Sequence, residues 1–88
     1  MIDLSAIDLN LLVAFEALYA EQSVTAAAQR IHVGQPAMSA ALGRLRSLFA
    51  DDLFVRVGRE MKPTAKAEAI APQVATALNA IRSALNAP

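Results

Sequence analysis

The sequence contains no cysteine and no long run of apolar residues. Without cysteine, disulfide bonds and thiolate metal sites are excluded. A membrane-spanning helix needs about 18 consecutive apolar residues, and no run in this chain approaches that length. The first ten residues, MIDLSAIDLN, lack the basic segment followed by an apolar one that marks a secretory signal. We therefore expect a soluble, cytoplasmic chain with no membrane partner and no metal or other cofactor.

A catalytic constellation is also missing. The single histidine, His32, has no acidic neighbour in sequence and no serine or cysteine nucleophile motif beside it. Asp51 and Asp52 form an acidic pair that lacks the spacing of a calcium-binding loop. The three glycines are not arranged as a phosphate-binding loop. We expect that the chain is not an enzyme, because no residues support even a fragment of an active site.

Charge is balanced overall but unevenly distributed. The formal net charge is zero, which by itself argues against nucleic acid as a partner. Residues 1–21, however, hold four acidic and no basic side chains, whereas residues 30–66 hold seven Lys and Arg against three Asp and Glu. This asymmetry predicts an acidic back and a basic binding edge. The alternative is that these ions are simply solvated.

The 88 residues are enough for one small domain with a limited core. Twenty of them are alanine, the best helix former, so helices should dominate. Asp8 is a good N-cap and predicts a first helix at about 8–21. Ser23 predicts the start of a second helix at about 24–31, whose alanines allow another helix to approach closely.

Residues 34–49, GQPAMSAALGRLRSLF, carry the most informative pattern. Spacings of four, three and four place these apolar residues on one face of a helix: Met38, Leu42, Leu45 and Phe49. Gly34 can be the N-cap, and Pro36 is tolerated in a first turn, where its missing N–H would be unpaired anyway. Hydrogen-bond donors and cations occupy other positions, namely Gln35, Ser39, Arg44, Arg46 and Ser47.

This helix follows the second one after a short turn that includes Gly34, which matches a helix-turn-helix. Its tip is narrow and polar, with Gln35, a small Ala37 and Ser39. A helix that enters the major groove of DNA needs such a tip, so we predict DNA recognition. The alternative is an ordinary surface helix whose polar face is merely solvated.

After residue 49 the apolar period shortens to two. Residues 53–57, LFVRV, have β-forming apolar side chains at every second position, which predicts a strand. Gly58 and Arg59 can turn the chain into a second strand at 60–62, which the following proline ends. We predict that this hairpin is a wing whose tip residue, Arg59, contacts phosphate or the minor groove. For Arg56, a solvated strand charge is the alternative.

Thr64 can cap a last helix that extends to about Asn86. Its apolar residues form a heptad-like seam, and we assign these to dimerisation: Ile70, Val74, Ala77, Leu78, Ile81 and Leu85. Pro72 lies inside this helix and should kink it. The helix is long for so small a domain, so we predict self-association along the seam. The alternative is that the seam packs entirely on its own domain.

Three stretches now stand in a specific order: DLNLLVAFEAL, SVTAAAQRIHVGQPAMSAALGRLR and LFADDLFVRVGREMKPTAKAEAI. Together they resemble the N-terminal DNA-binding domain of LysR-type transcriptional regulators, most of all the branch of nodulation-gene regulators and efflux activators. The resemblance covers nearly all of the chain. It implies an all-α fold with a small β-hairpin, that is, a winged helix-turn-helix at 1–63 and a linker helix at 64–88. Linker helices of that family pair antiparallel to form the dimer, and a separate effector-binding domain follows.

The resemblance also implies contacts to DNA through Gln35, Pro36 and Ser39, with Arg59 on the wing and Thr25 near the backbone. Ala40 stands where the family usually has arginine, and Gly34 where serine is common. Adding the cations that can set register on phosphates, we predict this set of DNA-contacting positions: Thr25, Arg30, Gln35, Pro36, Ala37, Ser39, Ala40, Arg44, Arg56, Arg59 and Lys62.

The resulting hypothesis is a homodimeric, sequence-specific domain that binds double-stranded DNA for a bacterial transcription regulator. Its operator would carry two dyad-related half-sites about one helical turn, or a multiple of it, apart. The alternative function is a helical dimerisation or adaptor module that uses its helix-turn-helix for protein contacts. Salt separates the two hypotheses, because only DNA binding weakens steeply through counterion release.

Overall fold

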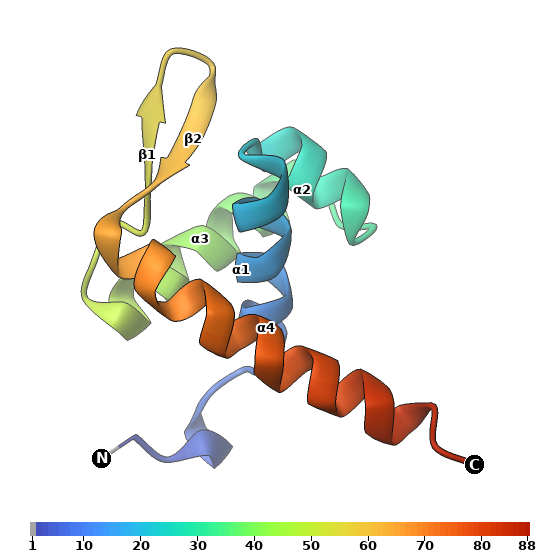
Figure 1. Cartoon of the computed structure of the whole chain (residues 1–88). Coiled ribbons are helices and arrows are strands. Elements are labelled where there is room, and N and C mark those ends of the chain that lie inside the picture. The colour runs from blue at the N-terminus through green and yellow to red at the C-terminus, as the bar shows by residue number, and fades with distance from the viewer. Residues whose placement is uncertain (1) are drawn as a thin grey trace.

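Three helices, a β-hairpin and one long helix follow each other along the chain (Figure 1), as the sequence predicts. The structure is a computed structural model that describes residues 2–88. A short 3-10 turn, η1 (Leu4–Ala6), precedes these elements. Their bounds are α1 (Asn10–Glu21), α2 (Val24–Arg30), α3 (Gln35–Phe49), β1 (Phe54–Val57), β2 (Glu60–Pro63) and α4 (Ala65–Leu85). None of the helices within residues 2–88 is long and apolar enough to cross a membrane.

The helix starts follow the predicted caps with one exception. Ser23 Oγ accepts the Ala26 N–H at 3.1 Å, and Gly34 is the N-cap of α3. Helix α1 begins at Asn10 rather than at residue 8, and its N-cap is Leu9, so the prediction of Asp8 as N-cap is wrong. The Asp8 carboxylate still accepts the Asn10 N–H at 3.0 Å, which explains why the sequence pattern pointed to Asp8.

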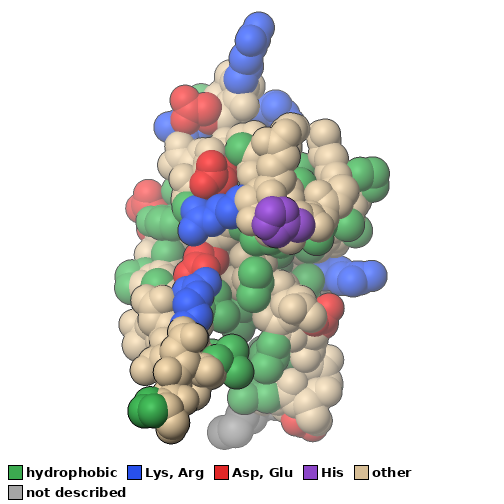
Figure 2. All heavy atoms as spheres, turned by 90° about the vertical axis from the view of Figure 1, so that its right-hand side faces the viewer, with side chains coloured by type: hydrophobic (Ala, Val, Ile, Leu, Met, Phe, Trp, Pro, Cys, Tyr) green, Lys and Arg blue, Asp and Glu red, His purple; other side chains and the backbone are tan. Residues whose placement is uncertain are grey.

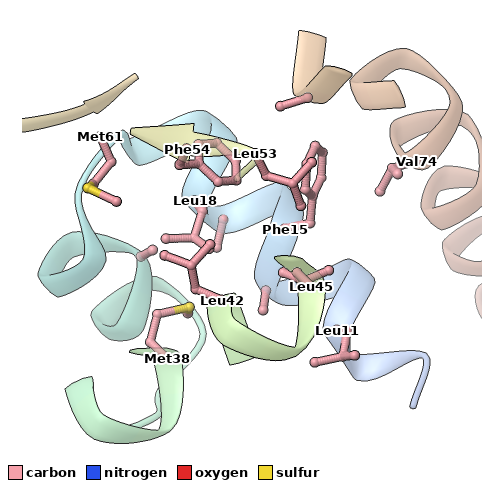
Figure 3. Packing of buried hydrophobic residues seen from close by; sticks show 14 of the residues in the cluster. Leu11, Phe15, Leu18, Met38, Leu42, Leu45, Leu53, Phe54, Met61 and Val74 are labelled. Carbon is pink, nitrogen blue, oxygen red and sulfur yellow. The ribbon is translucent and has the colours of Figure 1, made fainter. Parts of the chain in front are cut away.

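The core forms around α1, which contacts α2, α3 and α4. Figure 3 shows the side chains that meet there from α1, α3 and the base of the hairpin: Phe15, Leu18, Leu42, Leu45, Leu53 and Phe54. The rings of Phe15 and Phe54 lie 5.5 Å apart, centroid to centroid, which fixes the hairpin base on α1. Ala27 and Ala28 of α2 are buried, as their small size predicts.

The hairpin confirms the predicted wing but begins one residue later than predicted. The strands are antiparallel, with Arg56 opposite Met61 and Val57 opposite Glu60. Gly58 at the turn has φ +63°, a conformation that costs glycine little. Leu53 is outside β1 because its own φ is +62°, although its side chain is fully buried. The hairpin then leaves the body of the domain, and most of its side chains are exposed.

Helix α4 begins as predicted, because Thr64 Oγ1 accepts the Ala67 N–H at 3.2 Å. It ends at Leu85, with Asn86 as the C-cap, and continues without a break through Pro72. The first part of α4 packs on the domain and its C-terminal part projects away from it (Figure 1). Glu16 of α1 pairs with Arg82 near that end, and this ion pair raises the pKa of Arg82.

The predicted seam on α4 divides into two parts. Val74 and Leu78 are buried in the domain's own core, and Ile70 is half-buried. Ile81 is 50% exposed and Leu85 80% exposed. The alternative that the seam packs entirely on its own domain is therefore wrong for the C-terminal half. Only that half, together with exposed Ala77, is free to meet a partner.

Candidate nucleic-acid interface

The exposed face of α3 carries the residues of this helix that the sequence predicts for contacts to DNA. Met38, Leu42 and Leu45 point into the core. The other side is therefore solvent-facing, and these predicted contact residues are exposed on it: Gln35, Pro36, Ala37, Ser39, Ala40 and Arg44. A Cβ at Gly43, one turn beyond Ser39, would have no atom within 4 Å other than those of its chain neighbours and the local helix backbone. The first half of α3 thus presents a narrow face of small and polar groups.

The N-terminus of α3 is open to an anion. Gly34 has no side chain to cap the first turn, and Pro36 has no N–H of its own. The remaining first-turn amides and the positive end of the helix dipole are therefore left for a negatively charged group outside the chain. A phosphate is such a group.

The turn between α2 and α3 has a left-handed residue that the sequence pattern does not predict. His32 has φ +59°, whereas Gly34 has φ −73°. Histidine is one of the few non-glycine types enriched in this region. The Val33 N–H donates to the Ala28 carbonyl at 3.0 Å, which closes the turn. Glycine in this turn therefore serves as the cap of α3, and His32 provides the change of direction.

The predicted phosphate-contacting cations differ in how they are held. Arg30 lies 3.1 Å from Glu21, and the Lys62 amine lies 2.8 Å from Glu60. In the described part of the chain three others are exposed and have no ion pair, namely Arg44, Arg56 and Arg59. Thr25 is also exposed, at the first turn of α2.

On the face that Figure 2 shows, charge is less segregated than the sequence suggests. On the face in Figure 2, cationic side chains alternate with acidic and apolar ones instead of gathering in one broad patch. A cationic side chain forms the end of the molecule at the top of that view, which is the wing end. The wing thus carries two exposed arginines, Arg56 and Arg59, that have no ion pair among residues 2–88.

Arg46 is not part of the exposed face, contrary to its placement among the polar positions of the helix. Its Nε donates to the carbonyl of Asp52 and its Nη2 to the carbonyl of Phe54, both at 2.8 Å. The chain reverses after α3 and brings these two carbonyls back against the helix. Sequence periodicity cannot show this, because the contact depends on the path of the following loop.

Asp51 is a second residue whose role the sequence reading missed. Its Oδ2 accepts the Thr64 hydroxyl at 2.7 Å and the Leu53 N–H at 2.8 Å. The Thr64 hydroxyl, followed by the Leu53 amide, lowers the pKa of the Asp51 carboxyl. The bond to the amide two residues on is an Asx turn, and an aspartate just after a helix is the only signal for it in the sequence.

These bonds surround a strained residue at the base of the wing. The Phe54 N–H donates to the Asp52 carbonyl at 2.6 Å, and Leu53 between them has φ +62°, which is the rare form of a γ-turn. Strained backbone persists where its surroundings over-determine it. Here the Leu53 N–H bonds Asp51 and the Leu53 carbonyl accepts from the Thr64 N–H at 2.8 Å. We call residues 51–54 the wing base.

Similarity to known proteins identifies the family of this chain. The sequence profile of the bacterial regulatory helix-turn-helix proteins of the lysR family matches residues 9–68. The chain belongs to this family. It is 61% identical over 72 residues to nodulation protein D 1 of Rhizobium leguminosarum bv. phaseoli, an alignment that covers 82% of this chain. The chain spans 23% of the length of that curated relative.

Solved structures agree on the fold. The probable transcriptional regulator PA0477 from Pseudomonas aeruginosa is 46% identical, with a TM-score of 0.89, over 93% of this chain and 28% of that one. The DNA-binding domain of BenM in complex with benA site 1 DNA is 25% identical, with a TM-score of 0.81, over 90% of this chain and 89% of that one.

These comparisons confirm the predicted class. The LysR-family chain has the winged helix-turn-helix fold of a DNA-binding domain, with four α-helices and a two-stranded hairpin in residues 2–88. A family of regulatory helix-turn-helix proteins also agrees with the expectation that the chain is not an enzyme.

Proposed function

We propose that this LysR-family domain binds operator DNA as a sequence-specific dimer and directs a bacterial transcription regulator to its sites. The observation that carries the proposal is the exposed, uncapped start of α3, whose polar side chains face solvent on the same fold that BenM presents to DNA. The whole regulator would act in the cytoplasm, and the effector-binding part would lie outside this chain.

Two side chains in the first half of α3 would recognise the bases. Gln35 and Ser39 stand one turn apart on the exposed face, so both would reach base edges when α3 enters the major groove. A glutamine side chain can bond adenine N6 and N7 together. Pro36, Ala37 and Ala40 would then lie against thymine methyl groups or sugars, where their small size allows close approach.

Phosphate contacts would set the register of α3 on the duplex. Arg44, Arg56 and Arg59 are available at once, because none of them is ion-paired within residues 2–88. Arg30 and Lys62 would exchange a carboxylate for a phosphate, and Thr25 would reach the backbone beside α2. The wing would place Arg59 at the minor groove or backbone next to the half-site that α3 reads.

Dimerisation would use the C-terminal half of α4. A groove of about 420 Å³ runs between the start of the chain, α1 and α4, and its lining is mostly apolar: Leu4, Leu9, Asn10, Leu12, Val13, Ala77, Leu78 and Ile81. Fully burying one such side chain contributes about 1.5–3 kcal/mol, so exposure of Leu4, Ile81 and Leu85 in a monomer is costly. A second copy, with its α4 antiparallel, would cover this surface and fix the distance between two copies of α3.

A salt titration tests the proposal against the adaptor alternative. The measurement is the affinity for a mixed-sequence duplex of about 40 base pairs at a series of potassium chloride concentrations. DNA binding predicts that log K falls linearly with log salt, with a slope of roughly −0.9 for each phosphate neutralised. An adaptor with an apolar interface would show no measurable DNA binding, or binding that does not respond to salt.

A further inference from the structure

Arg46 occupies a position that suggests a role in DNA binding without a contact to DNA. Its guanidinium bonds the carbonyls on both sides of the strained Leu53, at 2.8 Å each. Arg44, two residues earlier on the same helix, is exposed and has no ion pair among residues 2–88. The two arginines lie on the same helix and carry the same charge, but only Arg46 is bonded to the wing base.

The strand ladder explains why a carbonyl of β1 is free to accept from Arg46. The Thr64 N–H bonds the Leu53 carbonyl, so the register makes Leu53 and Thr64 a hydrogen-bonded pair. Pairs alternate along an antiparallel ladder, so Phe54 and Pro63 form the next, non-hydrogen-bonded pair. Pro63 then loses nothing by lacking an N–H, and the Phe54 carbonyl points away from β2, where Arg46 meets it.

This arrangement links the recognition helix directly to the wing. One end of the Arg46 side chain belongs to α3, and the other end holds Asp52 and Phe54, which begin the wing. A guanidinium is planar and offers its donors in a fixed fork, so two bonds fix orientation as well as distance. Lysine, a single point charge on a flexible stem, cannot hold both carbonyls in this way.

We propose that Arg46 is a positioning residue for DNA binding, which fixes the wing relative to the recognition helix so that Arg59 and the α3 face engage one site together. The inference rests on the proposed function. Two of the five N–H donors of Arg46, one on Nε and one on Nη2, hold the wing base, and the proposal assigns Arg46 no contact to phosphate. Its effect on affinity is therefore exerted through Arg59.

A double-mutant cycle tests the coupling. The variants are Arg46→Met, Arg46→Lys and Arg59→Ala, singly and combined, with Arg44→Met as the matched control. The probe is a duplex that the parent protein recovers from a random library. If Arg46 positions the wing, Arg46→Met lowers affinity by a factor close to that of Arg59→Ala, and the double variant loses no more than one of them alone. Arg46→Lys, which keeps the charge, shows the same loss.

The slope of log K against log salt concentration distinguishes a phosphate contact from a positioning role, because only the loss of a phosphate contact changes it directly. Arg44→Met is expected to reduce the slope of log K against log salt by about 0.9 with or without Arg59. Arg46→Met is expected to leave the slope unchanged in the Arg59→Ala background. A slope reduced in that background, with multiplicative losses of affinity, would overturn the proposal and make Arg46 a phosphate contact.

Folding and the proposed function are checked separately. Circular dichroism and thermal melting establish that each variant folds, and if Arg46→Met does not, the Arg46→Lys cycle carries the test. A lysine variant that folds and binds like the parent would overturn the proposal. A parent protein that binds no duplex would refute the proposed function, whereas a parent that binds, with additive variants, would refute only the role of Arg46.

Discussion

The Thr64 hydroxyl lies 2.7 Å from the carboxylate of Asp51 and joins the end of the recognition helix to the start of the last helix. Asp51 follows the end of α3, and Thr64 is the N-cap of α4. The same hydroxyl oxygen accepts the Ala67 N–H, so one threonine both starts α4 and holds the wing base. Helix α3, the wing and helix α4 therefore meet at a few residues of fixed geometry.

Asp51 predicts how the fold responds to acid. Hydrogen bonds from Thr64 and Leu53 lower the pKa of Asp51 in the folded state, so its stabilisation is present above the unfolded pKa, about 3.9. It is lost as the pH falls through the lower folded pKa. Asp51→Asn should therefore lower Tm at pH 7. When the pH is lowered to about 3, the Tm of this variant should fall by less than the Tm of the parent does. Melting curves at both values measure this, with exposed Asp52→Asn as control. Equal acid sensitivity of Asp51→Asn and the parent would contradict the assignment.

The exposed position of Gln35 predicts that its replacement lowers the sequence specificity of DNA binding. Its side chain is exposed at the first residue of α3. Gln35→Ala should cost about 1–3 kcal/mol on a cognate site and flatten the preference at one position in each half-site. Gln73→Ala, on the exposed surface of α4, should change neither quantity. Fluorescence anisotropy on cognate and random duplexes makes the comparison, and equal losses on both would exclude base reading by Gln35.

Arg59 predicts a dependence on the flanking sequence. It follows Gly58 at the tip of the wing, and arginine is attracted to the narrow minor groove of A·T-rich DNA. Arg59→Ala should weaken binding most where the flanks are A·T-rich, while the fold stays intact. Lys66→Ala removes a cation outside the wing and serves as the control. If affinity falls by the same factor on G·C-rich flanks, Arg59 contacts phosphate at most.

Ile81 predicts the oligomeric state. It is half-exposed on the projecting part of α4, and a charged residue there would meet its own counterpart in a symmetric seam. Ile81→Glu should keep its helical content, sediment as a monomer and retain only weak half-site binding. Ser83→Glu adds the same charge to an exposed position nearly opposite on the helix and should stay dimeric. A mass that does not change from a dimeric parent to Ile81→Glu would place the interface elsewhere.

Local signals predicted most of the elements and little of what joins them. Helical spacing identified the buried face of α3, and Ser23 and Thr64 marked the starts of α2 and α4 because capping depends on adjacent residues. The wing was readable from a strand period followed by glycine at the turn. Each of these features is determined within a few residues of sequence.

The turns that connect these elements could not be predicted from the sequence, because residues other than glycine occupy their left-handed positions. Among residues 2–88, four residues other than glycine have positive φ, namely Gln22, His32, Ala50 and Leu53, and the first three of them follow helices. Only the tertiary contacts select these conformations, as the bonds to Asp51 and Thr64 do for Leu53. The bonds of Arg46 cannot be predicted for the same reason, because its acceptors lie in the loop after α3 and at the first residue of β1.

Selection from a random duplex library tests the central claim most directly. The dimeric, DNA-reading domain proposed here predicts an enriched motif of two dyad-related half-sites, centred about 10–10.5 base pairs apart or a multiple of that distance. Selection with Gln35→Ala in parallel should lose the preference at one position of each half-site. Recovered sequences that show no enrichment over the input library would contradict sequence-specific binding. An enriched single half-site without a dyad would contradict the dimer.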